Sequence, residues 1–330
     1  MTLKSPLPVM LMTAKNKYVA DIVAGETFQD IFVLAEKSMA HKRDGNPFLT
    51  VALADKSGQI RGVVWDDVAT AASAAVTGDY VFVKAAASEY RGTLQLVVKS
   101  IQAVPIEGVS PADFLPSTKR DVDQMFTRLK ALTDSIRAPE LKALMDAFWN
   151  DAEFTRLFQQ APAAKQMHHA YVGGLLEHTL SMALLADKVA GHYGGVDRDL
   201  LLVGVVLHDV GKVRELSFSR SIDYTDEGRL LSHIVIGVQM VEDKIQTIPD
   251  FPAHQAAMVK HMIVSHHGTR DFGSPEPPKT IEAVLLNYVD EIDSRVNAIR
   301  EFIAAEAPGE TWTSYHRLLE RHFYIGHNSE

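Results

Sequence analysis

The sequence contains no cysteine among its 330 residues. Disulfides, thiolate metal ligands and a cysteine nucleophile are therefore excluded, and any metal site must use histidine, carboxylate and water ligands. Long apolar runs are also absent: no stretch reaches 18 apolar residues, and the apolar N-terminal stretch is interrupted by Pro6 and Pro8. Because a membrane-spanning helix needs about 20 apolar residues, the sequence predicts a soluble, unsecreted cytoplasmic protein without a membrane partner.

An excess of positive charge is missing too, since the formal net charge is −9. Residues 1–110 carry eleven basic and eleven acidic side chains, so the whole acidic excess falls in the rest of the chain. The net charge by itself argues against a nucleic-acid-binding protein, although bound divalent cations can offset part of the clustered carboxylate charge in the C-terminal part. A neutral N-terminal module can still carry a local basic groove.

Residues 20 to 105 are rich in β-branched and aromatic residues that alternate with polar ones, which predicts strands. Five predicted strands with a helix between the third and fourth is the order of an OB-fold, a small barrel that binds oligonucleotides or oligosaccharides. The pattern resembles the OB-folds of tRNA synthetases and polymerase subunits. The predicted strands cover 28–34, 48–54, 60–65, 80–85 and 93–99, and the helix covers 66–76.

Basic and aromatic side chains near the predicted loops and outer strands are candidate nucleic-acid contacts. The other interpretation of each is that the aromatics belong to the barrel core and the charges to a solvated face. Phe48 above all is expected in the core. The candidates are Lys42, Arg43, Trp65, Lys84, Tyr90, Arg91 and Lys99.

Prolines at 105, 111 and 116 predict a linker after the barrel, and apolar residues at helical spacing follow it. We therefore expect an α+β multidomain protein: an N-terminal five-stranded OB-fold barrel, then an all-α domain. The expected boundaries are 1–108 for the barrel, 109–165 for a linker and helical connection, 166–305 for the all-α domain and 306–330 for a C-terminal helical extension.

Histidine and aspartate gather in short strings in the C-terminal half. One string ends in Leu-Glu-His178, and another reads His208-Asp209-Val-Gly-Lys212. His233 lies between a serine and an apolar run, His266-His267 precedes a glycine, and Asp290 is followed three residues later by Asp293.

The ordered set of His178, His208-Asp209 and Asp290 resembles the H…HD…D signature of the HD superfamily of metal phosphohydrolases. The further His233 and His266-His267 resemble its binuclear members. With the OB-like module in front, most of the chain resembles the YhaM-type 3′-to-5′ exoribonucleases.

The residues support a metal site independently of the resemblance. Residues 200–207 are apolar on every face, which predicts a buried helix that runs into His208 and Asp209. Polar groups at the end of a buried helix are costly unless they are paired or metal-bound. Two neighbours on a helix diverge by about 100°, so we expect His208 to bind one metal and Asp209 to bridge to a second.

The resemblance implies two sets of ligands that share one carboxylate, with two divalent metals. Manganese is the expected metal, and magnesium, cobalt, iron, nickel and zinc are alternatives. Which of His266 and His267 binds directly stays open. The first set is His178, His208, Asp209 and Asp290, and the second is Asp209, His233, His266 and His267.

Three further residues receive roles in the expected hydrolysis, in which two metals activate a water and stabilise the attacking and leaving oxygens. Lys212 is expected to neutralise a phosphate oxygen. His169 either contacts the scissile phosphate, or protonates the leaving oxygen, or is structural. Asp293 is expected to orient a ligand histidine.

One position departs from the binuclear HD enzymes that hydrolyse cyclic dinucleotides, some of which carry a ligand glutamate one turn before the first histidine. That position is Gly174 here. The departure argues against an extra metal and against that subfamily.

Three functions fit the sequence. The first is a metal-dependent 3′-to-5′ exonuclease that releases nucleoside 5′-monophosphates from single-stranded RNA, with single-stranded DNA as a further substrate. The second is a phosphohydrolase of small or cyclic nucleotides, with the barrel as an interaction surface. The third is an RNA-binding adaptor with a structural metal, which the complete ligand set argues against. Self-association is compatible with each.

Overall fold

The computed structural model divides the chain into a barrel unit and a helical unit. The barrel unit ends at Ser117 and also includes residues 218–221, while the remaining residues form the helical unit. The structure describes residues 15–326 apart from Arg43, Arg91, 106–108, 166–168, 307–309 and the side chain of Phe272.

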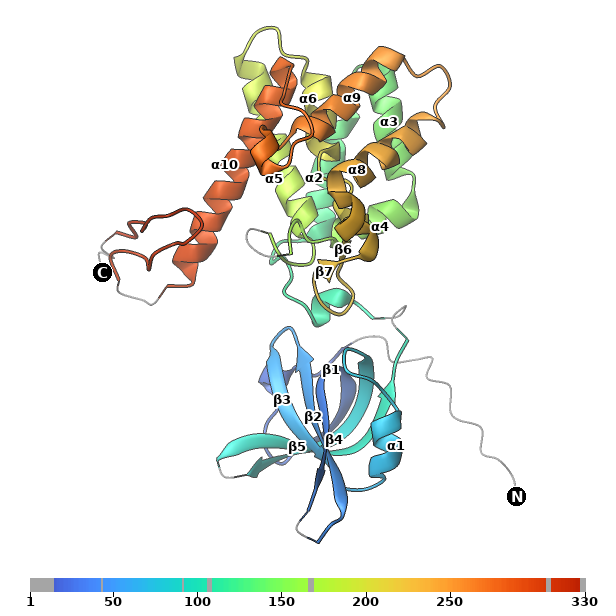
Figure 1. Cartoon of the computed structure of the whole chain (residues 1–330), viewed down its shortest axis with the longest axis vertical. Helices are drawn as coiled ribbons and strands as arrows, with labels where there is room; N and C mark the ends of the chain where they lie inside the picture. The colour runs from blue at the N-terminus through green and yellow to red at the C-terminus, as the bar shows by residue number, and fades with distance from the viewer. Residues whose placement is uncertain are drawn as a thin grey trace. The chain divides into compact units, whose positions relative to one another are not determined.

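The barrel unit is a closed five-stranded barrel in the order β1-β2-β3-β5-β4, with a short helix α1 between β3 and β4 (Figure 1). Neighbouring strands are antiparallel except β3 and β5, which pair in parallel. The predicted OB-fold is confirmed. The elements are β1 (Thr27–His41), β2 (Pro47–Asp55), β3 (Gly58–Val64), α1 (Val68–Ser73), β4 (Tyr80–Tyr90) and β5 (Thr93–Ala103).

The barrel closes around the alternating apolar residues that predict its strands. Phe32, Leu34, Val81 and Leu96 are fully buried in its core. Their neighbours along each strand point outward, because successive side chains of a strand lie on opposite faces. Burial of the apolar set fixes the register. On the outer face, Ile31 and Tyr80 are buried in a second cluster with Phe114, so this face is only partly polar.

The helical unit contains nine helices and a two-stranded sheet within the described residues (Figure 1). A central helix, α6, is buried at every residue from Leu200 to Leu207, as its all-apolar sequence predicts. The helices are α2 (Val122–Asp134), α3 (Pro139–Trp149), α4 (Ala152–Gln160), α5 (Gly174–His192), α6 (Arg198–Leu207), α7 (Lys212–Glu215), α8 (Asp226–Ile245), α9 (Ala253–Ser265) and α10 (Ile281–Ala304). The strands are β6 (Leu216–Ser217) and β7 (Asp223–Tyr224).

The first three helices belong to this body rather than to a connection. Helices α2 and α4 pack on α5, and α3 packs on α6. The expected segment 109–165 is therefore divided: its part from Thr118 onward lies in the helical unit.

The C-terminal extension differs from the expectation. Helix α10 ends at Ala304, and residues 310–326 contain no helix but two isolated bridges, Trp312 with Tyr324 and His316 with Arg321. The predicted helical extension is wrong for these residues. Two threonines and four aromatic residues lie in this segment, and such side chains favour extended backbone.

No helix among the described residues is long and apolar enough to cross a membrane.

Candidate metal centre

Five helices of the helical unit bring the predicted histidines and aspartates to one place. The apolar faces of these helices are buried around α6. The histidines and aspartates lie near the ends of the apolar runs. His178 lies on α5, His208 and Asp209 directly follow α6, His233 lies on α8, His266 and His267 directly follow α9, and Asp290 lies on α10.

The Asp209 carboxylate occupies the middle of this cluster. Its Oδ2 lies 3.2 Å from His208 Nε2 and 3.8 Å from His178 Nε2. Its Oδ1 lies 3.5 Å from His233 Nε2 and 3.8 Å from His266 Nε2. Each oxygen therefore faces a different pair of imidazoles.

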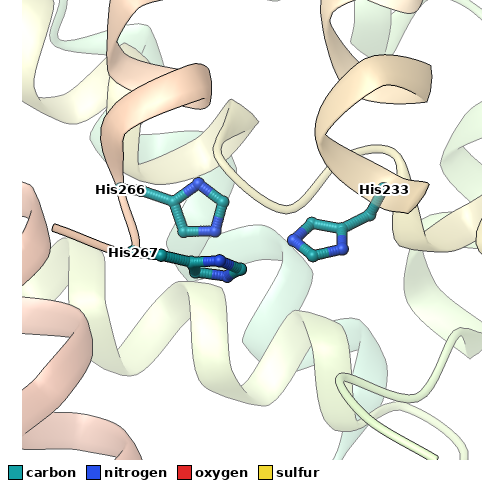
Figure 2. A group of neighbouring side chains, drawn as sticks. All are labelled: His233, His266 and His267. Carbon is teal, nitrogen blue, oxygen red and sulfur yellow. The ribbon is translucent and has the colours of Figure 1, made fainter. Parts of the chain in front are cut away.

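Two groups of donor atoms lie on the two sides of Asp209. His178, His208 and Asp290 offer atoms within 4.8 Å of one another, and so do His233, His266 and His267. Figure 2 shows the three rings of the second group gathered from α8 and the end of α9. Both groups correspond to the ligand sets expected from the sequence.

The local geometry at His208 differs from the expectation in one respect. Helix α6 ends at Leu207, and His208 is its C-cap. The side chains of His208 and Asp209 converge instead of diverging by a helical step. Because the helix stops, Asp209 reaches both groups from a turn.

Backbone carbonyls set the tautomer of two rings. His208 Nδ1 lies 2.8 Å from the Val205 carbonyl, and His266 Nδ1 lies 2.7 Å from the Ile263 carbonyl. A carbonyl only accepts hydrogen bonds, so each Nδ1 carries the proton. In the neutral form of each ring, Nε2 is then the unprotonated nitrogen, and it is directed toward Asp209 as in metal-binding histidines.

Carboxylates orient the rings of His178 and His233. His178 Nδ1 lies 2.8 Å from Asp293 Oδ2, which is the contact that the sequence predicts for Asp293. Ser181 donates to the other oxygen of Asp293. On the second side, Glu215 Oε1 lies 3.0 Å from His233 Nδ1 and accepts the His233 backbone N–H at 2.9 Å.

A strained residue precedes His233. Ser232 has φ 61° and ψ 160°, and it breaks α8 into two helical segments. Such a conformation is essentially restricted to glycine and costs on the order of 1–3 kcal/mol. With this kink, the His233 backbone N–H and the His233 ring both contact the same Glu215 oxygen. The kink therefore positions the His233 side chain at the centre.

Close backbone contact also holds α8 against the turn after α6. A Cβ on Gly211 would lie 2.1 Å from the His233 carbonyl oxygen and 2.7 Å from the Gly237 nitrogen. Only glycine allows this approach. Gly211 therefore lets the segment that carries Asp209 reach the helix that carries His233.

Several buried polar atoms here have no hydrogen-bond partner among the described residues, and each costs free energy unless a cation or another donor compensates it. Nitrogen and carboxylate oxygen, without sulfur, suit divalent ions such as manganese, iron, cobalt, nickel or zinc. The donor set therefore fits a divalent metal. The atoms are His208 Nε2, Asp209 Oδ1, His233 Nε2, His266 Nε2 and His267 Nδ1.

The charges at the centre act differently on different ligands: burial would lower the pKa of His208, but the charge of Asp209 outweighs it and raises this pKa. Burial alone would raise the pKa of the Asp209 carboxyl, but Lys212 and His208 outweigh it and hold this pKa well below its usual range. The Lys212 ammonium lies 2.6 Å from Asp209 Oδ2. Burial, then the charge of His208, lowers the pKa of His266 well below its usual value, so that ring is neutral and able to bind a metal.

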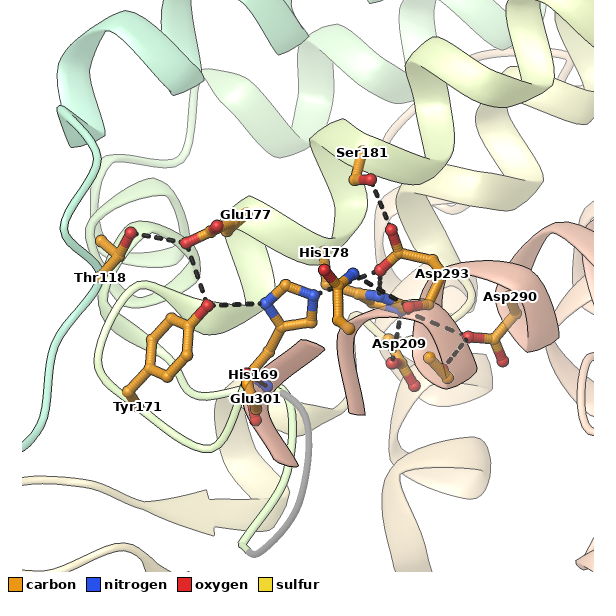
Figure 3. A network of polar contacts seen from close by, with 12 residues as sticks. Thr118, His169, Tyr171, Glu177, His178, Ser181, Asp209, Asp290, Asp293 and Glu301 are labelled. Atoms are coloured by element: carbon orange, nitrogen blue, oxygen red, sulfur yellow. Dashed lines mark hydrogen bonds and ion pairs between the residues drawn. The ribbon is translucent and has the colours of Figure 1, made fainter. Parts of the chain in front are cut away.

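His169 is buried behind the first group, and both of its ring nitrogens contact protein atoms. Its Nδ1 lies 2.9 Å from the Tyr171 hydroxyl, and its Nε2 lies 3.3 Å from Asp293 Oδ2. Figure 3 shows the chain of contacts that continues from Tyr171 through Glu177 to Thr118. His169 thus lies where it supports Asp293, which in turn orients His178.

The backbone of His169 explains the departure at Gly174. A Cβ on Gly174 would lie 2.0 Å from the His169 carbonyl oxygen. No side chain fits there without moving the loop, so a glutamate at this position is incompatible with the observed path of His169.

The structure brings together only some of the candidate nucleic-acid contacts of the barrel. Lys42 Nζ lies 4.8 Å from the centre of the Trp65 ring, and Phe48 packs on Trp65 with ring centres 5.0 Å apart. Trp65 is exposed, and Phe48 lies outside the barrel core against the expectation. Leu49 pairs with Val64 between the antiparallel strands β2 and β3, which brings the preceding Phe48 beside Trp65.

The remaining candidates are separate from this aromatic pair. Lys84 and Lys99 are exposed on the neighbouring strands β4 and β5, and Tyr90 is exposed at the hairpin end between them. No described contact links these residues to Trp65. Arg43 and Arg91 lie outside the described residues.

Family models match both units. An HD domain model matches residues 175–295, and an OB-fold nucleic acid binding domain model matches residues 33–104. A putative helicase model matches residues 105–193.

Curated relatives match along almost the whole chain. A 3′-5′ exoribonuclease YhaM of Listeria innocua is 34% identical over 314 residues, covering 94% of this chain and 98% of that protein. A protein of the same name from Bacillus velezensis is 34% identical over 301 residues, covering 91% and 95%.

Solved structures match the barrel region. The second OB-fold domain of replication protein A from Methanococcus maripaludis is 19% identical, covers 27% of this chain and 93% of its own, and has a TM-score of 0.22. The mitochondrial single-stranded DNA binding protein Rim1 of S. cerevisiae is 20% identical, covers 25% and 96%, and has a TM-score of 0.23.

The contact between Glu215 and His233 makes a testable prediction about metal affinity. Glu215→Ala removes the acceptor that orients His233, and loss of such a supporting contact typically weakens metal binding about 10–100-fold. Titration of the metal-free protein with Mn²⁺ in a calorimeter measures the change. The matched control is Glu227→Ala, which removes an exposed carboxylate paired with Arg214. Equal Mn²⁺ affinity in both variants would contradict the assigned role.

Proposed function

Because the chain belongs to the YhaM family of 3′-5′ exoribonucleases with an HD domain, we propose that it degrades single-stranded RNA from the 3′ end in a metal-dependent reaction. The product is a nucleoside 5′-monophosphate. The structural observation that best supports the proposal is the position of the Asp209 carboxylate between two groups of donor atoms. One of its oxygens faces each group.

Each group would hold one divalent ion, and Asp209 would bridge the two. His178, His208 and Asp290 complete one site, and the second uses the three histidines from α8 and α9. Manganese is the proposed metal, since imidazole and carboxylate donors suit it. Two bound ions would supply an activated water and stabilise the charge on the phosphate.

The protein side chains have separate tasks around the phosphate. Lys212 holds its ammonium at the Asp209 carboxylate, where it would neutralise a phosphate oxygen. His169 makes hydrogen bonds to Tyr171 and Asp293, which favours a positioning role over proton donation to the leaving oxygen.

The barrel would bind the RNA strand. The exposed Trp65 ring packs on the half-buried Phe48 ring and has Lys42 beside it, which is an aromatic and basic arrangement of the kind on which bases stack. Lys84, Tyr90 and Lys99, with Arg43 and Arg91, are proposed as further contacts. Stacking is tolerant of base identity, so we expect little sequence preference and some binding of single-stranded DNA. An RNA substrate fits the cytoplasmic location predicted from the sequence.

We also propose that the chain self-associates through α10. Five apolar side chains at helical spacing on this helix are between 36% and 62% exposed. A symmetric pair of these stripes would bury on the order of 1,000 Å², the lower range for a stable interface. The stripe consists of Ile281, Val284, Tyr288, Ile292 and Val296.

The first prediction concerns the reaction itself. Purified protein with Mn²⁺ should shorten a 5′-labelled single-stranded RNA stepwise from its 3′ end and release mononucleotides, and a chelator should stop the reaction. Asp209→Ala should abolish cleavage and lower the metal content, whereas Lys212→Ala should slow turnover and keep the metal. Intact RNA together with hydrolysis of bis-p-nitrophenyl phosphate would instead indicate a phosphohydrolase of small nucleotides.

The second prediction tests the aromatic pair of the barrel. In the inactive Asp209→Ala background, Trp65→Ala should weaken binding of a fluorescent single-stranded RNA about tenfold, since stacking of one base contributes about 1–3 kcal/mol. Trp312→Ala, which removes an exposed tryptophan of the helical unit, is the control. If both variants bind RNA as the parent does, the strand binds elsewhere.

The third prediction concerns the α10 stripe. Ile292→Asp places a charge in the middle of the proposed interface, so the molar mass from light scattering should fall to that of a monomer. Val23→Asp adds the same charge at an exposed apolar residue of the barrel unit and should leave the mass unchanged. A monomeric parent protein would rule out this interface.

A further inference from the structure

A cavity of about 460 Å³ lies beside the metal centre within the helical unit. Lys212, Glu215 and His233 line one part of it, and these residues belong to the centre or support it. Lys165, Leu216 and Tyr224 also line it, and none of these three has a role in the proposed hydrolysis. A volume of this size suits one nucleotide rather than a strand.

The Tyr224 ring is an exposed aromatic surface on a fixed backbone. Tyr224 pairs with the buried Leu216 in the sheet of β6 and β7, so its main chain is held against α7. Its side chain nevertheless remains 42% exposed. A ring of this kind beside a cavity offers a stacking surface at little conformational cost.

A basic side chain is fixed beside the same ring. Lys165 Nζ lies 2.7 Å from Asp223 Oδ1 and 5.7 Å from the centre of the Tyr224 ring. Asp223 precedes Tyr224 on β7, and Arg229 also contacts it at 3.2 Å. The ammonium is therefore placed to donate to the acceptor atoms of whatever stacks on Tyr224.

We propose that this cavity binds the 3′-terminal nucleoside of the substrate, with its base stacked on Tyr224 and Lys165 donating to its acceptor atoms. The inference rests on the proposed exonuclease function. The terminal nucleotide is the one residue of the strand without a continuing 3′ chain, so it alone fits a cavity of single-nucleotide size. Its 5′ phosphate would lie at the Lys212 and His233 side, where the proposed cleavage takes place.

This assignment gives a physical reason for cleavage without base preference. Every base has a face that stacks on an aromatic ring, and stacking contributes about 1–3 kcal/mol for any of them. The described lining of the cavity offers no pattern of side chains that would read a particular base edge. Tyr224 thus acts as a binding residue for the terminal nucleoside rather than as a reader of sequence.

The test uses Tyr224→Ala in the full-length, Mn²⁺-loaded protein, with two measurements. Binding of adenosine 5′-monophosphate, the type of product that would occupy the cavity, should weaken about tenfold in calorimetry. The kcat/KM for single-stranded RNA should fall about tenfold relative to that for bis-p-nitrophenyl phosphate, which has no nucleoside. Tyr224→Trp should restore both values. Tyr193→Ala, which removes an exposed tyrosine after α5, is the matched control.

Three results would overturn the inference. Unchanged nucleotide binding with a raised KM for RNA would mean that the cavity holds an internal nucleotide. An equal fall for RNA and the small ester would mean that Tyr224 acts through the fold. If the parent protein fails to shorten RNA, the proposed function is wrong, and equal nucleotide affinity of parent and Tyr224→Ala would then separately overturn the cavity assignment.

Discussion

One buried carboxylate determines the architecture of the candidate metal centre. Asp209 lies among four imidazoles and one ammonium, and burial of a single charge is costly unless its surroundings compensate it. Lys212 compensates part of this cost and keeps the carboxyl ionised. The end of α6, the kink of α8 and the glycine contact at Gly211 all serve the approach of side chains to this one residue.

Within each of the two donor groups, different rings are held in place by different means. His208 and His266 bond to carbonyls three residues back, so the ends of their own helices fix them. His178 and His233 depend on carboxylates from other parts of the chain, Asp293 and Glu215. Each side of Asp209 thus includes one locally fixed ring and one ring fixed by tertiary contact, and His267 is the third ring of the second side. Metal affinity should accordingly be sensitive to packing of α7 and α10.

In the barrel, the residues that stabilise the fold differ from those proposed to bind the strand. Its fully buried core sets the strand register, while Phe48 and Trp65 lie together on the surface with Lys42. Trp65 is exposed and Phe48 is half-buried, so their contact lies outside the buried core of the barrel. In the helical unit, the exposed aromatic Tyr224 lines a cavity.

The sequence by itself determined the two-part fold and the ligand types, because alternation predicts strands, an all-apolar run predicts a buried helix, and the histidine strings follow such runs. It did not determine the directions of side chains at helix ends, the supporting role of Glu215, the contacts of His169 or the bridges of residues 310–326. The two supporting carboxylates act on partners far along the chain: Glu215 lies 18 residues from His233, and Asp293 lies 115 residues from His178. The rings at the helix ends instead bond to carbonyls three residues back. Hydrophobic periodicity in the sequence predicts which face of a helix or strand is buried. Only tertiary packing decides which polar atoms come into contact at the candidate metal centre.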